Sequence, residues 1–343
     1  MSEDGPLLIA RAPTDSADLL GAFAGLDNIE IEFTEVSTNS LNEGFEKLQN
    51  GETDLLLAAA NDVSELGELE QGLMIVGALP LRDWNYVLVS EDRPNHLPKN
   101  AIVLSQNQLV RRQLRRFRPD ARVRSPKAHL GITETEKPES LDYDDIYSFV
   151  NWAEELRQSD EIDGYVIPRH IHRLAGFKTR RHALTQDAAE DELFRFLPLP
   201  HAGTIIIIGR TGFPRNKISA MLDHEAETSW QVNEILLKNM NSDIKNKVGI
   251  LVRHRQPGTL IREAERKRDL LTRNVLVNPE GELTTDEVKV DIQIELVSHR
   301  GNSTISMQRI ADLQDTTVVT NFLSDEWSNL VKLGTRDGKF LDL

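Results

Sequence analysis

The stretch TIIIIGRTG, residues 204–212, decides how this chain folds. Its four consecutive isoleucines, Ile205 to Ile208, predict a strand that is buried on both faces. The Gly-Arg-Thr-Gly that follows predicts a turn. This strand comes late, after a second complete run of alternating strands and helices. A central strand at this point indicates that the chain crosses back into its first sheet.

The first part of the chain, up to about residue 100, alternates strand-like and helix-like segments. Residues 7–10 and 54–60 are apolar runs, and residues 29–36 alternate apolar and polar side chains. A helix is predicted between the last two, because apolar residues at helical spacing follow Ser40, a typical N-cap, and end at Gly51. Such alternation predicts a parallel sheet covered by helices.

A second round of alternation begins near residue 100 and leads into a smaller unit. Predicted strands are 101–104, 122–124 and 164–167, and predicted helices are 108–117, 146–156 and 223–240. Residues 247–297 predict a small α+β unit with a charged helix over 260–271. Residues 307–343 are too irregular in pattern for a prediction.

Composition excludes several classes of function. The chain has 343 residues, which predicts two or three domains, and a formal net charge of −15. That acidic balance argues against a nucleic-acid-binding protein. The chain contains no cysteine. Disulfides, zinc–thiolate and iron–sulfur sites, and any thioether-linked cofactor are therefore excluded.

Location and membrane contact can also be predicted. The N-terminal residues MSEDGPLLIA are acidic where a signal peptide would be basic, and no apolar run approaches the ~20 residues that span a bilayer. We expect a cytoplasmic, soluble monomer with no membrane partner and no nucleic-acid partner.

Four fragments occur in an order and spacing that are specific. They are residues 44–54 with Asn61-Asp62-Val63, then QLRRFRPD (113–120), DGYVIPRHIHRLAG (163–176) and LPLPHAGTIIIIGR (197–210). Together they resemble the hydroxymethylbilane synthase (porphobilinogen deaminase) family of tetrapyrrole biosynthesis, from about residue 7 to 255. A weaker similarity continues to about residue 305.

The resemblance implies an α/β fold with two periplasmic-binding-protein-like lobes and a small α+β third domain. The expected boundaries are 6–98 with 197–217 for lobe 1, 99–196 for lobe 2, 218–306 for the small domain and 307–343 for a C-terminal extension. The family is a transferase. It joins four porphobilinogens, with loss of ammonia, onto a dipyrromethane cofactor that is bound to a cysteine of the small domain.

One carboxylate is expected to be catalytic. Asp62 occupies the position of the family's catalytic Asp, where a fixed negative charge stabilises cationic intermediates at the pyrrole nitrogens. It directly follows a buried strand, where ligand-binding residues gather in α/β sheets. The alternative is that Asp62 only caps the chain after the strand.

The expected substrate-binding residues depart from the family's pattern. Arg11 and Thr14 lie near its Thr-Arg-x-Ser segment, and Asn61 replaces a lysine. Asn107 aligns with the first residue of the family's Ser-x-Arg-Arg segment, and Lys127 keeps the positive charge of a later arginine in the family's pattern. Arginine binds carboxylates bidentately, so these changes weaken a site for the acetate and propionate groups of pyrroles.

The cofactor position differs most. The family's Met-Asn-Thr-x-Leu-x-Gly-Gly-Cys loop aligns with Met240 to Val248, so that Val248 replaces the cysteine. A valine side chain cannot form a thioether. We therefore expect no cofactor, and the family's usual mechanism is in doubt.

Two further patterns are open to a functional and a structural interpretation. Seven arginines between Arg111 and Arg124 could contact an anion or RNA, but an exposed helix paired with acids at i,i+4 is favoured. Arg111 and Arg112 lie two residues after the positions that align with the family's Arg-Arg pair. They are therefore about 200° further round the helix and are not expected to face the cleft. His170 and His172 could bind a metal from one face of a strand; a surface pair is favoured, and no metal is expected.

Three hypotheses follow. The first is a degenerate homologue, a pseudoenzyme that binds a small anionic ligand, a pyrrole or a tetrapyrrole between its lobes. The second is an active porphobilinogen deaminase that makes hydroxymethylbilane with a non-covalent primer. The third is a scaffold whose cleft is empty and whose role is protein contact. The sequence leaves open whether the chain is an enzyme.

Overall fold

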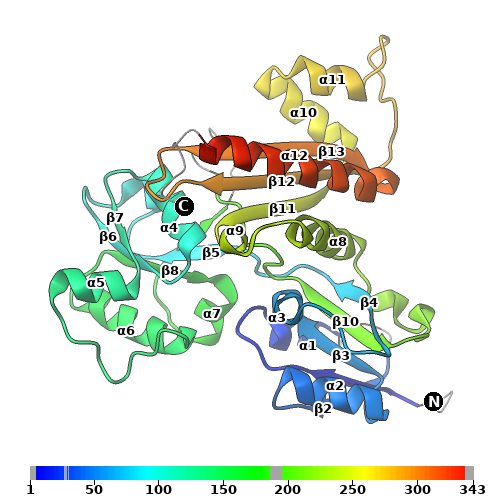
Figure 1. The fold of residues 1–343 in the computed structure, drawn as a ribbon, viewed down its shortest axis with the longest axis horizontal. Coiled ribbons are helices and arrows are strands. Elements are labelled where there is room, and N and C mark those ends of the chain that lie inside the picture. Colours follow the sequence, from blue (N-terminus) through cyan, green and yellow to red (C-terminus); the bar gives the residue numbers. More distant parts are fainter. Residues whose placement is uncertain (1–4, 27–28, 30, 186–194, 337–343) are drawn as a thin grey trace. The chain divides into compact units, whose positions relative to one another are not determined.

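The computed structural model describes residues 5–26, 29, 31–185 and 195–336 (Figure 1). Its contacts divide the chain into two compact units. The first unit contains residues 1–106, 122–184 and 201–230, and the second contains 107–121, 185–200 and 231–343. Among the described residues, no helix is both long enough and apolar enough to cross a membrane.

The first unit contains two lobes, and the first of these has a five-stranded sheet in the order β2-β1-β3-β10-β4. Its strands are β1 (Leu7–Arg11), β2 (Phe33–Ser37), β3 (Leu55–Ala59), β4 (Leu73–Leu79) and β10 (Ile205–Arg210). Strands β1, β2 and β3 are parallel, and β10 is antiparallel to both of its neighbours. Ile205 to Ile208 are fully buried, so the predicted return of the chain to its first sheet is confirmed.

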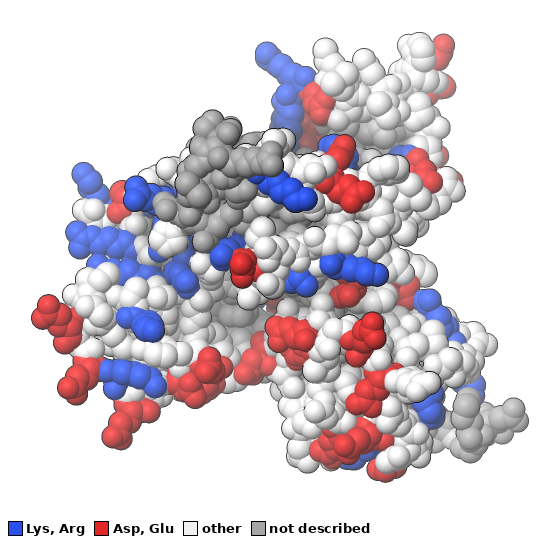
Figure 2. Space-filling view, in the orientation of Figure 1, with Lys and Arg blue, Asp and Glu red and all other residues white. Residues whose placement is uncertain are grey.

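Helices cover this sheet where the sequence places them. They are α1 (Leu19–Leu26), α2 (Leu41–Asn50), α3 (Ala60–Leu66) and the short 3-10 helix η3 (Arg215–Met221). Helix α2 has the predicted caps, because the Ser40 hydroxyl accepts a hydrogen bond from Glu43 N and Gly51 adopts a φ of 77°. Figure 2 shows Asp and Glu side chains gathered over this lobe.

The second lobe repeats the topology of the first. Its strands are β5 (Tyr86–Val89), β6 (Ile102–Ser105), β7 (Arg122–Arg124), β8 (Gly164–Pro168) and β9 (Arg181–Leu184), in the order β7-β6-β8-β5-β9. Its other elements are η1 (Pro94–His96), α5 (Pro126–Thr133), α6 (Ile146–Gln158) and α7 (Arg169–Leu174). Strand β5 is antiparallel to β8 and β9, as β10 is to β3 and β4.

This repeat corrects one predicted boundary. Strand β5 pairs within the second sheet, so the first lobe ends between β4 and β5 rather than at residue 98. The tetrapeptide Tyr86–Val89 is a short apolar run that either sheet could bury, and its pattern alone does not choose between them. The chain therefore passes between the lobes twice, after β4 and after β9.

The second unit is a small α+β domain with an antiparallel sheet in the order β11-β12-β13. Its strands are β11 (Val248–Arg255), β12 (Lys289–Val297) and β13 (Thr304–Asp312). Its helices are α4 (Gln108–Phe117), α9 (Ser242–Lys245), α10 (Pro257–Lys267), α11 (Leu270–Leu276), η4 (Leu313–Asp315), α12 (Thr316–Arg336) and the end of α8 (His224–Lys238). The predicted class, α/β with two lobes and a small α+β domain, is confirmed.

The C-terminal residues belong to this domain rather than extending from it. Strand β13 and helix α12 cover much of 307–343, and α12 buries Leu323 and Trp327 in the core formed by β11, β12 and α8. The buried positions recur at helical spacing, from Thr316 and Thr320 to Val331. The predicted boundary at residue 306 also falls inside β13.

Helix α4 is not the exposed helix that its arginines predict. Arg112 is fully buried, and its Nη1 donates to the Val297 carbonyl at 2.9 Å. Arg116 Nη1 and Nη2 donate to the two carboxylate oxygens of Glu295 on β12 at 2.9 and 3.1 Å. The β12–β13 turn lies against α4, and a Cβ at Gly301 would come within 2.4 Å of Arg116 N. The interpretation as a helix paired with acids at i,i+4 is therefore wrong.

Candidate functional site

Two loops of the first lobe bring a serine and an aspartate together. Strands β1 and β3 are parallel neighbours, so the loop after β1 and the start of α3 lie at the same edge of the sheet. The Ser16 hydroxyl donates to Asp62 Oδ1 at 2.6 Å, and Ser16 N donates to Thr14 Oγ1 at 2.9 Å. Asp62 sits in the first turn of α3, where the helix dipole favours a negative charge.

The second lobe contacts the same loop through a histidine. His170, which is 4% exposed, donates from Nε2 to the backbone carbonyl of Asp15 at 2.9 Å. It lies in α7, directly after the parallel strand β8. Burial lowers the pKa of His170, so its ring is neutral at pH 7. The contact therefore joins the carboxyl edges of the two sheets without adding a charge.

Three carboxylates surround this contact. Burial raises the pKa of Asp15, with further contributions from Asp145 and Asp62, while His170 acts in the opposite direction. Asp145 caps α6 by accepting from Tyr147 N and Ser148 N at 3.0 and 3.1 Å. The pKa of Tyr147 is raised by burial, then by Asp15 and Asp145. Residues from both lobes thus form one acidic cluster with two hydroxyl groups, which we call the interlobe cluster: Asp15, Ser16, Asp62, Asp145, Tyr147 and His170.

Ion pairs hold α7 against the first lobe beside the interlobe cluster. Asp18, which is 3% exposed, pairs with Arg173 and also caps α1 through Gly21 N at 3.0 Å. Asp83, in the segment between β4 and β5, pairs with Arg169 at 3.0 Å and Arg173 at 3.5 Å. These contacts fix where the second-lobe histidine meets the loop after β1.

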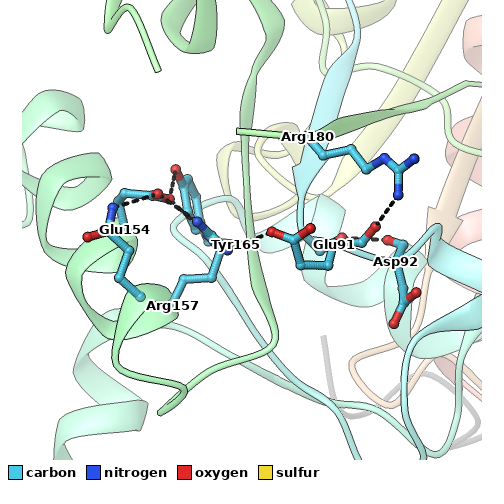
Figure 3. Close-up of polar contacts among 8 residues, drawn as sticks. Glu91, Asp92, Glu154, Arg157, Tyr165 and Arg180 are labelled. Atoms are coloured by element: carbon cyan, nitrogen blue, oxygen red, sulfur yellow. Dashed lines mark hydrogen bonds and ion pairs between the residues drawn. The ribbon is translucent and has the colours of Figure 1, made fainter. Parts of the chain in front are cut away.

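A network of hydrogen bonds and ion pairs links α6 to other parts of the second lobe (Figure 3). Glu154 accepts hydrogen bonds from Arg157 at 2.8 Å and from the Tyr165 hydroxyl at 3.0 Å. Burial raises the pKa of Glu154, but the hydrogen bonds from Arg157, Gln158 and Tyr165 outweigh it and lower the pKa overall. Arg157 also reaches Glu91 at 3.3 Å, which ties α6 to the segment after β5.

The predicted site residues separate into two groups. Asp62 and Thr14 lie together with Ser16, as described. Arg11 is paired with Glu35 on β2 at 3.0 Å, and Asn61 donates to Glu65 within α3 at 3.0 Å.

The remaining predicted positions lie elsewhere. Lys127 is exposed near the start of α5. Asn107 caps α4 in the second unit, where it accepts from Val110 N at 3.0 Å. Val248, at the position of the family's cysteine, is fully buried in β11 opposite Leu296. A binding role for Lys127 and Asn107 stays a prediction.

The histidine pair differs from the sequence prediction. His170 and His172 lie on helix α7 rather than on a strand, and they are 4% and 1% exposed. Positions two apart on a helix point in directions about 200° apart, so the two rings do not share a face. The surface-pair interpretation is wrong. The residues that the structure describes contain no group of three side chains suited to a metal ion.

Four residues of the interlobe cluster were not predicted from the sequence: Asp15, Ser16, Asp145 and Tyr147. Asp15 and Ser16 lie in the polar segment PTDSAD, residues 13–18, which follows the first strand. That position was a usable signal, because loops after parallel strands form ligand sites. Asp145 and Tyr147 carried no such signal, since they lie beside an acidic loop that predicts only solvent contact.

Comparisons with known proteins add little. No known family's sequence model matches the chain, and no curated protein matches it. Among solved structures, an ABC transporter protein from Parabacteroides distasonis is 13% identical, covers 81% of this chain and 83% of its own, and has a TM-score of 0.33. A periplasmic substrate-binding protein of an ABC transporter from Coxiella burnetii is also 13% identical, with 66% and 96% covered and a TM-score of 0.32.

A third solved structure is the GluR0 ligand-binding core from Nostoc punctiforme in complex with L-glutamate. It is 14% identical, covers 66% of this chain and 97% of its own, and has a TM-score of 0.26. Similarities of this size carry no information about function. The chemistry of the site must come from its own residues.

Proposed function

We propose that this chain is a two-lobe protein that binds a small ligand at the interlobe cluster, and that the ligand presents N–H groups or a protonated nitrogen. The observation that carries the proposal is the hydrogen bond of 2.6 Å from Ser16 to Asp62, beside the contact of Asp15 with His170. Each lobe supplies polar groups from the carboxyl edge of its sheet, which is where α/β proteins bind ligands.

The charges at the interlobe cluster favour one of the ligand classes that the sequence leaves open. The carboxylates that act on Asp15 are those of Asp145 and Asp62, and the neutral ring of His170 adds no positive charge at pH 7. Carboxylates accept hydrogen bonds and repel anions. Arg11, a predicted anion ligand, is already paired with Glu35. Nitrogen donors of a ligand, such as a pyrrole N–H, therefore fit these carboxylates better than its negatively charged groups do.

The proposal also draws on the resemblance to the hydroxymethylbilane synthase family. In that resemblance Asp62 aligns with the carboxylate that acts on pyrrole nitrogens, and its hydrogen bond from Ser16 holds one oxygen in place. Val248 offers no thiol, so we propose a degenerate homologue without a covalent cofactor that works in the cytoplasm. An active deaminase with a non-covalent primer is the rival function.

Calorimetry with porphobilinogen tests the proposal. We expect binding of one ligand per chain, and we expect Asp62→Asn to weaken it at least tenfold, because a hydrogen bond to a charged group contributes about 1.5–3 kcal/mol. The matched control is Glu35→Gln, which removes a carboxylate of the same lobe that pairs with Arg11, outside the cluster. Its affinity should stay within twofold of the unmodified chain.

Two results would overturn the proposal. If porphobilinogen does not bind, or binds equally well to Asp62→Asn and to the unmodified chain, the interlobe cluster is not its site. Sustained release of ammonia together with a linear tetrapyrrole product would establish the rival deaminase function instead of simple binding. Release of ammonia should be measured in the same samples. If the chain is a deaminase, Asp62→Asn should abolish this release.

A further inference from the structure

The small domain contains a groove of about 480 Å³ that is separate from the interlobe cluster. Two segments that are far apart in the sequence form it. One is the segment that follows α8 and contains α9, residues 239–247, and the other lies in the C-terminal half of α12, residues 327–332. Its volume falls in the range of about 300–1,000 Å³ that small-molecule sites occupy.

The floor of this groove is apolar and well packed. Trp327 and Val331, which are 3% and 7% exposed, belong to the core of the small domain, and Met240 and Ile244 pack against that core. A rigid aromatic floor of this kind suits a flat ring, which it can contact without ordering flexible side chains. The apolar floor of the groove is therefore part of the packed core of the small domain.

The rim carries a cation that has no carboxylate partner among the residues that the structure describes. Lys247 is half-buried, and no ion pair joins it to Asp243, which lies four residues earlier on the same rim. The amide of Asn239 donates to Ser324 Oγ at 3.3 Å, and Asn241 caps α9. Lys247 therefore places a positive charge beside the apolar floor.

We propose that this groove binds a small planar aromatic carboxylate. The ring would lie over Trp327 and Val331, and the carboxylate would accept a charge-assisted hydrogen bond from Lys247 Nζ. A neutral ring would lose the lysine contact, and a cationic ring would be repelled by it. This site is independent of the interlobe cluster and does not rest on the function proposed for it.

The test uses the full chain and two probes of the same size, 1-naphthoate and 1-naphthylmethylammonium, with binding measured by calorimetry. We expect one naphthoate per chain, bound at least tenfold more tightly than the ammonium probe. Lys247→Met should weaken naphthoate at least fivefold. The matched control, Lys245→Met, changes a neighbouring lysine that does not line the groove and should stay within twofold.

A blocking variant locates the site. Ser328 is a small residue on the groove wall, and Ser328→Trp should fill the groove and abolish naphthoate binding, whereas Asp62→Asn should leave it intact. Circular dichroism checks that each variant folds. The proposal fails if naphthoate does not bind, if both probes bind equally, or if neither Ser328→Trp nor Lys247→Met weakens binding.

Discussion

The ion pair between Arg116 and Glu295 allows a sharp test of the packing of the small domain. Its side chains are only 5% and 1% exposed. Glu295 accepts from Arg116 at 2.9 and 3.1 Å and from Gln113 Nε2 at 3.0 Å. Glu295→Gln keeps the shape but removes the charge and turns an acceptor into a donor. We predict a loss of about 3–5 kcal/mol in the free energy of unfolding, because the Arg116 charge stays buried without its partner.

The same domain supplies a matched control. Arg309 and Glu326 form an ion pair at 2.7 Å, but their side chains are 45% and 54% exposed. Solvent screens such a pair, so Glu326→Gln should cost less than about 1 kcal/mol. A double variant, Arg116→Met with Glu295→Met, should regain most of the stability that Glu295→Gln loses, since no unpaired charge is then buried.

Urea unfolding, followed by circular dichroism, measures all three variants. With a slope of about 1–3 kcal/mol per molar urea, Glu295→Gln should move the midpoint down by at least about 1 M. The reasoning is refuted if Glu295→Gln and Glu326→Gln shift the midpoint equally. It is also refuted if the double variant is less stable than Glu295→Gln alone.

Three further predictions concern other parts of the chain. Burial lowers the pKa of His129, His170 and His172 in the folded chain, so near and below pH 6.5 the unfolded chain binds protons that the folded chain does not. In thermal unfolding, the contribution of these histidines should therefore lower the stability as the pH falls from about 6.5 toward the folded pKa values, and it should level off below them. Leu323→Ala, at a fully buried position on α12, should lower the free energy of unfolding in urea by about 2–5 kcal/mol, whereas an outlying extension would lose almost nothing. Val248→Cys should leave the new thiol unreactive toward a disulfide reagent in the folded chain and reactive in denaturant, because residue 248 is fully buried.

Much of the fold is predictable because local signals agree with the final packing. The buried isoleucines of β10 and the apolar run of β3 fix the centre of the first sheet. The caps at Ser40 and Gly51 fix the ends of α2. These signals depend on neighbours in the sequence, which is why periodicity and turn chemistry find them.

The burial of α4 was not predictable in the same way. Arg116 pairs with a carboxylate 179 residues away, and arginines at helical spacing predict a solvated face unless that partner is known. Helix α12 was missed for another reason. It begins Thr-Thr-Val-Val, which is typical of a strand, and its first buried positions, Thr316 and Thr320, are polar, so buried apolar residues begin only at Leu323.

The candidate site was predictable in part. Asp62 could be placed at a strand end, and a ligand-binding role there follows from the edge of the sheet. Its partners could not be placed, because Asp145 and His170 belong to a second lobe whose first strand the sequence assigned to the first. Once β5 is assigned to the second sheet, loops of both lobes can be placed at the interlobe cluster. Only then can its acidic character be recognised.

The expectation of no covalent cofactor at residue 248 rests on the backbone as well as on one side chain. Val248 does not lie in a glycine-rich loop: it begins β11, pairs with Leu296 and packs against the core between α8 and α12. Asn246 and Lys247 stand where the family has two glycines, and Asn246 ends α9 directly before the strand. A cysteine at position 248 would therefore point into a packed core instead of toward a ligand. We therefore expect that Val248→Cys alone would not create a site for a covalent primer, so the proposed function must depend on groups outside that position, of which Asp62 is the first to test.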